Sequence, residues 1–278
     1  VVLFFLISGQ VVFLARPFLQ GKIIDALTKH ESLPYLLLLT ASLFGVYLLA
    51  NILDYFREYF EWKELYYDLE RFIRLDTLTQ LSRFSIGQHS NEHSGLRQST
   101  INQGKDAVRR LSEHFTYTLF PMLLQVTLAT TVILLTNWQV GVVILIASLL
   151  YIYLLFTHNM RFYPLMKKNT DDFQKLVKKE SEIIRHFSLI KAEAQEQSII
   201  KEYFDGVIPV EEFGKQIWIG HSKVYHSYQA FIELAQVGAL FMGIVLVTQG
   251  YTTPGTVVAL FGWISSVFGN LGNIGWMQ

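Results

Sequence analysis

The chain has 278 residues, of which 51% are hydrophobic and 17% are charged, and its formal net charge is zero. Charged residues make up about 25% of an ordinary soluble domain, so this chain is poor in charge, and its zero net charge gives no reason to expect nucleic-acid binding. With no cysteine, the sequence excludes disulfides, thiol catalysis and thiolate metal sites.

Four long tracts lack Asp, Glu, Lys and Arg, and they decide the class of protein. They are residues 1–15, 33–53, 115–160 and 234–278. Since a helix needs about 20 apolar residues to cross a bilayer, each of the last two tracts is long enough for two spans. We therefore predict an all-α integral membrane protein with six long helices. The expected spans are about 1–27, 34–86, 103–136, 139–190, 209–249 and 254–278.

The basic residues predict the orientation of these spans. Of the 23 lysines and arginines, 20 lie in the segments 57–110 and 158–223. Because positively charged loops stay on the cytoplasmic side, we expect both segments and both termini in the cytoplasm, in a bacterial inner membrane. Both ends of the sequence lie within apolar tracts, so we expect this chain to be part of a longer one.

The two basic segments look like helices rather than loops. From Tyr35 to Ile86 there is no proline and one glycine. A helix of that length would be about 78 Å long, against about 30 Å for the hydrocarbon core. We therefore expect the helices to extend far into the cytoplasm, with inner turns at 85–95 and at about 194–209.

Five short motifs occur in a characteristic order along the chain. They are RPFLQGKIIDAL (16–27), HSG (93–95) followed by DAV (106–108), NWQ (137–139), IKAEAQEQ (190–197) followed by Phe204, and QGYTTPGTVVA (249–259). Through these motifs the chain resembles the transmembrane domain of ABC exporters over essentially its whole length. It departs from the family pattern at Leu96, where an acidic residue is usual.

The resemblance implies an activity and a set of partners. It implies a membrane-spanning exporter half that moves a lipid, peptide or hydrophobic drug out of the cytoplasm by alternating access. The partners would be a nucleotide-binding domain, fused C-terminally, and a second exporter half in a homodimer or heterodimer. ATP and Mg²⁺ would bind that domain, because this chain has no G-x-x-x-x-G-K-[ST] phosphate loop and no other catalytic motif.

The two inner turns are the expected docking sites for the nucleotide-binding domain. By helix rise they lie some 25 Å or more below the bilayer, so we expect docking helices at about 94–101 and 194–203. Tyr203 and Phe204 are the candidate anchors of the second docking site, and the alternative is that these two side chains pack between helices. The candidate coupling residues are Ser94, Gly95, Leu96, Gln98, Ala194, Glu196, Tyr203 and Phe204.

Polar side chains inside the predicted spans are the candidates for a substrate cavity, because such groups are costly in lipid. The alternatives are snorkelling of the arginine to the headgroups, solvation of the glutamate, and hydrogen bonds between helices for the amides. The candidate residues are Gln10, Arg16, Asn51, Gln125, Glu233 and Gln236.

Histidine and aromatic clusters receive simpler interpretations. Residues 89–93 spell H-x-x-E-H, a zinc-protease pattern, but they fall in a predicted turn, so we expect a solvated turn and no metal site. His221 and His226 are expected on a helix surface. The aromatic run at 55–67 is expected to form an interfacial belt, with a substrate entrance as the alternative.

Two other classes of membrane protein remain open from the residues alone. One is a six-span ion-coupled transporter or channel, which would need acidic residues at mid-span, and Glu233 is the one residue that approaches this. The other is a membrane scaffold without transport activity.

Overall fold

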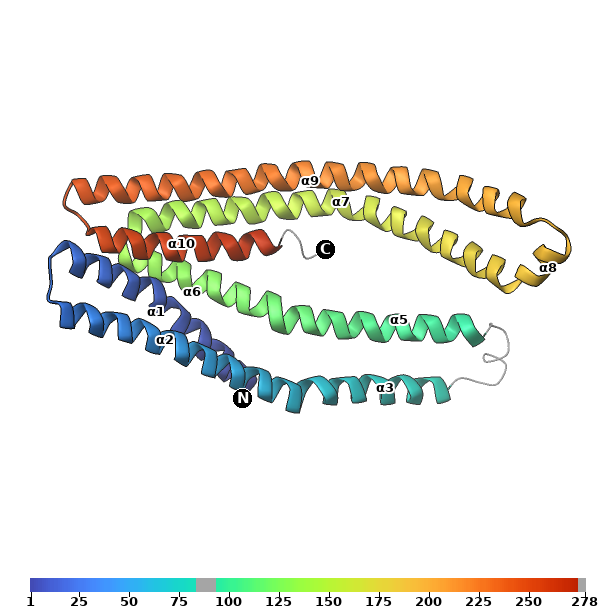
Figure 1. Ribbon diagram of the computed structural model, residues 1–278, viewed down its shortest axis with the longest axis horizontal. Coiled ribbons are helices and arrows are strands. Elements are labelled where there is room, and N and C mark those ends of the chain that lie inside the picture. Colours follow the sequence, from blue (N-terminus) through green and yellow to red (C-terminus); the bar gives the residue numbers. More distant parts are fainter. Residues whose placement is uncertain (84–93, 275–278) are drawn as a thin grey trace. The chain divides into compact units, whose positions relative to one another are not determined.

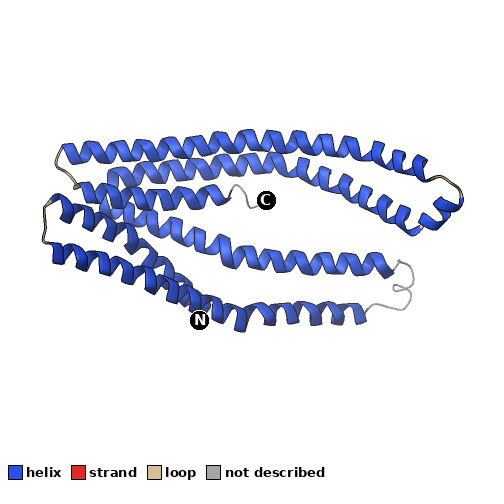
Figure 2. Cartoon of the chain, in the orientation of Figure 1, coloured by secondary structure: helices blue, strands red, loops and turns tan. Residues whose placement is uncertain are grey.

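The computed structural model describes residues 1–83 and 94–274; the side chains of residues 81, 94–101, 103 and 274 are outside this description. Within the described residues every regular element is a helix and no strand occurs (Figure 2), so the predicted all-α class is confirmed. The elements are α1 (Val2–Thr28), α2 (Leu33–Phe60), the π-helix η1 (Glu61–Tyr66), α3 (Tyr67–Ser82), α5 (Ser94–Glu113), the π-helix η2 (His114–Leu119), α6 (Phe120–Thr136), α7 (Trp138–Arg185), α8 (Phe187–Ala192), α9 (Glu196–Thr248) and α10 (Pro254–Ile274).

Six helical segments of the described chain are long and apolar enough to cross a membrane. They are Val2–Thr28, Leu33–Gln80, Gly104–Thr136, Trp138–Arg185, Glu196–Thr248 and Pro254–Asn273. Large apolar side chains stand exposed on them, such as Leu37 (61% exposed), Phe44 (63%) and Phe241 (67%). Lipid tails solvate such surfaces, whereas water does not. The chain is therefore an integral membrane protein.

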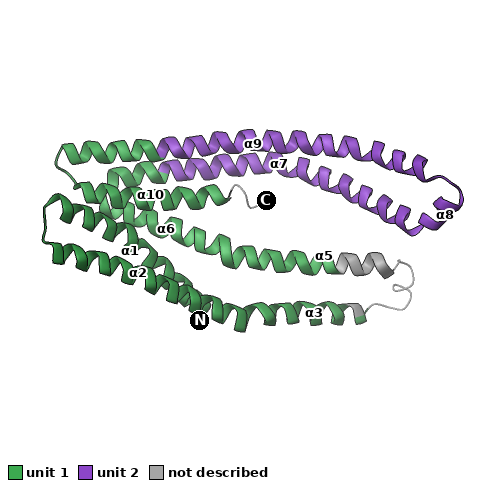
Figure 3. Cartoon of the chain, viewed as in Figure 1, with its two compact units in different colours: residues 1–145, 236–277 green, residues 146–235, 278 purple. Residues whose placement is uncertain are grey.

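The helices form two compact units (Figure 3). The first comprises residues 1–145 and 236–277; in it α1 packs against α2, α6 and α10, and α10 packs against α6 (Figure 1). The second comprises mainly residues 146–235, where α7 and α9 run side by side and α8 joins them at the tip of the hairpin (Figure 1).

Small residues and one carboxylate hold α1 and α10 together in the first unit. The backbones of Gly21 and Gly255 approach so closely that neither position has room for a Cβ. The Asp25 carboxylate accepts hydrogen bonds from the Gly255 N–H and the Thr253 hydroxyl, each at 2.8 Å. Asp25 thus caps the N-terminus of α10, where unpaired N–H groups favour an anion.

The turn at the tip of the α7–α9 hairpin is shorter than the sequence predicts and lies at the start of the expected range of about 194–209. Gly206 and Pro209, taken as helix breakers, lie inside α9, which begins at Glu196 rather than near 209. The chain turns instead at residues 193–195, where Ala194 adopts a left-handed φ of 52°. A hydrogen bond from the Gln195 N–H to the Ile190 carbonyl (3.0 Å) closes this turn, as in ordinary helix C-caps.

Candidate functional site

Arg16, one of the predicted cavity residues, lies between two aromatic rings. Its guanidinium carbon is 4.6 Å from the ring centre of Phe13 and 4.5 Å from that of Tyr47 on α2. Cation–π contacts of this kind stabilise a charge away from water. The Arg16 Nε atom is nevertheless buried without a hydrogen-bond partner. Its contacts therefore serve the packing of α1 on α2, and its role in a cavity stays a prediction.

The predicted amide and acidic candidates do not form one cluster. Gln125 on α6 accepts a hydrogen bond from the Asn270 side chain of α10 at 3.0 Å, which is the interhelical role weighed for it. The Gln10 Oε1 atom is buried without a hydrogen-bond partner. Asn51 and Glu233 are exposed and Gln236 is half-buried. The structure thus joins Gln125 to another helix and leaves the remaining candidates as separate positions.

The first set of predicted coupling residues lies at the start of α5. Ser94, Gly95, Leu96 and Gln98 occupy its first two turns, and their side chains are outside the described part of the structure. The H-x-x-E-H motif at 89–93 also lies outside the described residues.

The second set lies around the α7–α9 tip and divides into two kinds of residue. The Tyr203 hydroxyl donates a hydrogen bond to Glu180 Oε2 at 3.2 Å, so this side chain ties α9 to α7. Phe204, by contrast, is 61% exposed. Ala194 forms the turn and Glu196 begins α9, so neither lies in a separate docking helix.

A separate short helix at this tip is α8, which precedes the segment 194–203 where the sequence predicts a docking helix. It carries Phe187 and Leu189 exposed, and Ile190 buried against the hairpin. Two exposed apolar side chains on a six-residue helix, at the end of a hairpin rich in charge, are typical of a protein-binding anchor. The signal in the sequence was the segment FSLI (187–190), which overlaps the start of the IKAEAQEQ motif at Ile190.

His221 is buried, which corrects the expectation that it lies on a helix surface. Its Nδ1 atom is 3.0 Å from the Nε2 atom of His158 on α7. The rings of Phe162 and Trp218 pack against it, with ring centres 4.5 Å and 5.7 Å away. The sequence could not indicate this pair, because its members are 63 residues apart.

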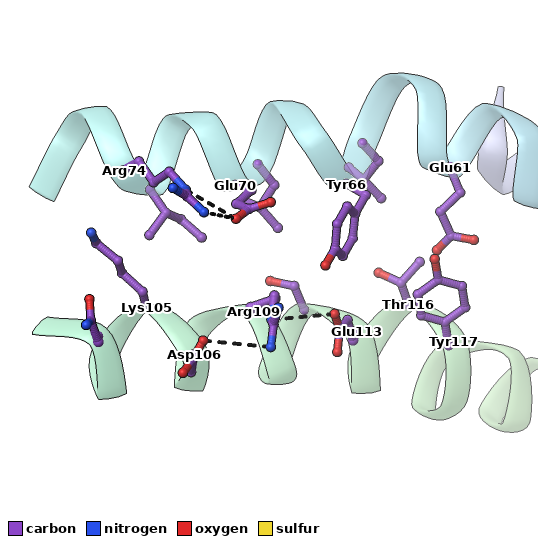
Figure 4. A pocket seen from close by; sticks show the side chains of 15 residues that line it. Glu61, Tyr66, Glu70, Arg74, Lys105, Asp106, Arg109, Glu113, Thr116 and Tyr117 are labelled. Carbon is purple, nitrogen blue, oxygen red and sulfur yellow. Dashed lines mark hydrogen bonds and ion pairs between the residues drawn. The ribbon is translucent and has the colours of Figure 1, made fainter. Parts of the chain in front are cut away.

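A cavity of about 280 Å³ opens between the α2–η1–α3 helix and the α5–η2 helix of the first unit (Figure 4). Both π-helices line it, and π-helical turns frequently mark functional sites. Its walls carry charges of both signs and phenol rings. The labelled lining residues are Glu61, Tyr66, Glu70, Arg74, Lys105, Asp106, Arg109, Glu113, Thr116 and Tyr117.

Ion pairs neutralise most of the charge in this cavity. Arg74 binds Glu70 at 2.5 Å. Arg109 lies 3.7 Å from Asp106 and 3.8 Å from Glu113. None of these residues was a candidate site residue from the sequence, because the two helices that bring them together are separated by the inner turn. The aromatic run at 55–67 was the nearest signal, since Tyr66 points into the cavity and the exposed Trp62 does not line it.

Comparison with known proteins gives three findings. The family model for the ABC transporter transmembrane region matches residues 1–271. Among solved structures, a bacterial Atm1-family ABC exporter with ATP bound superposes with a TM-score of 0.80 at 16% sequence identity. That match covers 99% of this chain and 49% of the exporter chain, so this chain spans about half the length of that protein. No curated protein sequence matches this chain significantly.

Proposed function

Because this chain belongs to the ABC transporter transmembrane family, we propose that it is the membrane-spanning half of an exporter that ATP drives. Its substrate would be an amphipathic or hydrophobic molecule, such as a lipid, a peptide or a drug. It would move out of the cytoplasm by alternating access, as helices rock around a central site. The proposed location is a bacterial inner membrane, with both termini in the cytoplasm.

The α7–α8–α9 hairpin is the observation that carries this proposal. α9 has 53 residues, which gives a helix of about 80 Å against a hydrocarbon core of about 30 Å. Much of the hairpin therefore projects from the membrane and presents α8 with Phe187 and Leu189 exposed. A long helical hairpin that projects from the membrane and exposes apolar side chains at its end is suited to bind a cytosolic domain and to move with it.

The proposed partner at α8 is a nucleotide-binding domain that holds ATP and Mg²⁺. A second exporter half is the other proposed partner of this chain. ATP can drive the membrane helices only if it binds one of their two conformations more tightly than the other. A nucleotide-binding domain docked on α8 would transmit this preference along the helices of the hairpin.

Transport by the full-length protein tests the proposal. We expect inside-out vesicles that contain the protein to accumulate a fluorescent short-chain lipid or a hydrophobic dye when ATP can be hydrolysed, and to continue when ionophores collapse the ion gradients. Vesicles without the protein provide the control. Accumulation that follows an ion gradient and ignores ATP would instead favour an ion-coupled transporter.

A further inference from the structure

The buried carboxylate of Glu61 is the least satisfied charged group of the cavity in Figure 4. Glu61 is 1% exposed, and no hydrogen bond of ordinary geometry reaches either of its carboxylate oxygens, both of which are buried. The Tyr117 hydroxyl of η2 interacts with this carboxylate (Figure 4), and so does the positive charge of Arg57. A buried carboxylate that has no ion pair within the described residues is costly, so Glu61 is suited to a ligand that supplies a positive charge.

The charges around Glu61 favour a cation at this end. Arg57 precedes it by one helical turn and lies 3.4 Å from Asp54 and 3.8 Å from Glu58. The same guanidinium also attracts Glu61, so one positive charge serves three carboxylates and an excess of negative charge remains. The rings of Tyr66 and Tyr117 line the same end, and phenol rings attract cations through their faces.

The opposite end of the cavity carries the bases. Lys105 has no ion pair within the described residues, and Arg74 lies at the same end of the cavity (Figure 4). Arg109 lies midway, where its charge is paired with Asp106 and Glu113 and it interacts with Tyr66. From Lys105 to Tyr117 the helix rises about 18 Å. This separation of charge along the cavity would direct a small cation away from Lys105 and Arg74 and towards Glu61.

We propose that this cavity binds a primary ammonium group, with Glu61 as its counter-ion and Tyr66 and Tyr117 as its aromatic walls. An ammonium group supplies three N–H donors, which the two oxygens of the Glu61 carboxylate can accept. The site lies about 12 Å along the helix beyond Leu53, the last residue of the uncharged tract of α2. There it could meet the headgroup of an aminolipid or a water-soluble amine.

This inference names a chemical group that the exported substrate would carry, and in that respect it rests on the proposed function. It is tested by calorimetric binding to the full-length protein in nanodiscs of phosphatidylglycerol. The probes are octylamine and N-octylacetamide, which has the same chain without the charge. We expect octylamine to bind and the acetamide to bind about tenfold more weakly or not at all.

Two variants locate the site. Glu61→Gln keeps the shape of the side chain and should weaken octylamine binding about tenfold. Glu64→Gln, an exposed residue of the same π-helix that does not line the cavity, should leave it unchanged. Equal affinity of both probes for the unmodified protein would overturn the inference even if Glu61→Gln failed to fold, and so would a folded Glu61→Gln that binds octylamine normally.

A soluble short-chain phosphatidylethanolamine distinguishes the two sources of the ammonium group. Its competition with octylamine would assign the site to a lipid headgroup, and binding of octylamine alone would assign it to a water-soluble amine; both support the inference. Loss of selective amine binding while ATP-driven transport persists would overturn this inference and leave the exporter proposal standing. Selective amine binding without such transport would do the reverse.

Discussion

Replacing Gly255 with alanine is expected to lower the stability of the domain by about 3 kcal/mol or more, the range of severe overpacking. A Cβ at this position would overlap the Gly21 carbonyl and lie 2.5 Å from Asp25 Cγ. The first of these is backbone, which cannot rotate away. The added methyl would therefore force α10 from α1 and break the hydrogen bond from the Gly255 N–H to Asp25.

The melting temperature and the yield of purified protein measure this effect. Gly269→Ala is the matched control, because it lies on the same helix with nothing within 4 Å of its added Cβ. Alanine is a better helix former than glycine by about 1 kcal/mol, so this control should be neutral or stabilising. A Gly255→Ala protein that melts at or above the temperature of the parent would show that α1 and α10 do not pack as described.

A second large effect is expected at α8. In the full-length protein, Leu189→Asp should reduce transport and substrate-stimulated ATP hydrolysis together by about tenfold or more, because buried apolar anchors dominate protein interfaces. Leu189 is 56% exposed in this chain, so folding should be unaffected. ATP binding should also remain, since the nucleotide would lie on the partner domain.

The control for this prediction lies on the same hairpin. Ile184→Asp changes an apolar residue of α7 that is 68% exposed, outside α8, and should have the smaller effect. Phe204→Ala tests the residue predicted from the sequence, whereas Tyr203→Ala removes the hydrogen bond to Glu180 and should mainly loosen the hairpin. Full transport by Leu189→Asp, or loss of transport through unfolding alone, would show that α8 is not the docking site.

The sequence was sufficient for the six spans and insufficient for the places where helices meet. Uncharged tracts indicate membrane spans directly, because a span needs about 20 predominantly apolar residues whatever its helix packs against. The hairpin turn was predicted too long because Gly206 and Pro209 are tolerated within α9, while Ala194, an ordinary helix former, takes the left-handed conformation. Helix propensities could not indicate that choice, since tertiary contacts override them.

The sequence also did not indicate which single polar residues are buried. His221 and Glu61 have nothing unusual next to them in the sequence, and each becomes buried through a helix distant along the chain. His158 covers His221 from α7, and η2 closes the cavity over Glu61. By contrast, the interhelical hydrogen bond weighed for Gln125 is present, because an amide within an apolar span has few other partners.

The central claim is that α9 crosses the membrane with its α8 end in the cytoplasm, where ATP is available. Labelling of single cysteines tests it most directly, because this chain has no cysteine of its own. Gln195 and Tyr251 lie just beyond the two ends of α9, and both are exposed. With cysteines elsewhere in the full-length protein replaced, a membrane-impermeant maleimide should label Gln195→Cys from the cytoplasmic side alone and Tyr251→Cys from the outside alone. Labelling of both positions from one side, or the reverse pattern, would contradict the account.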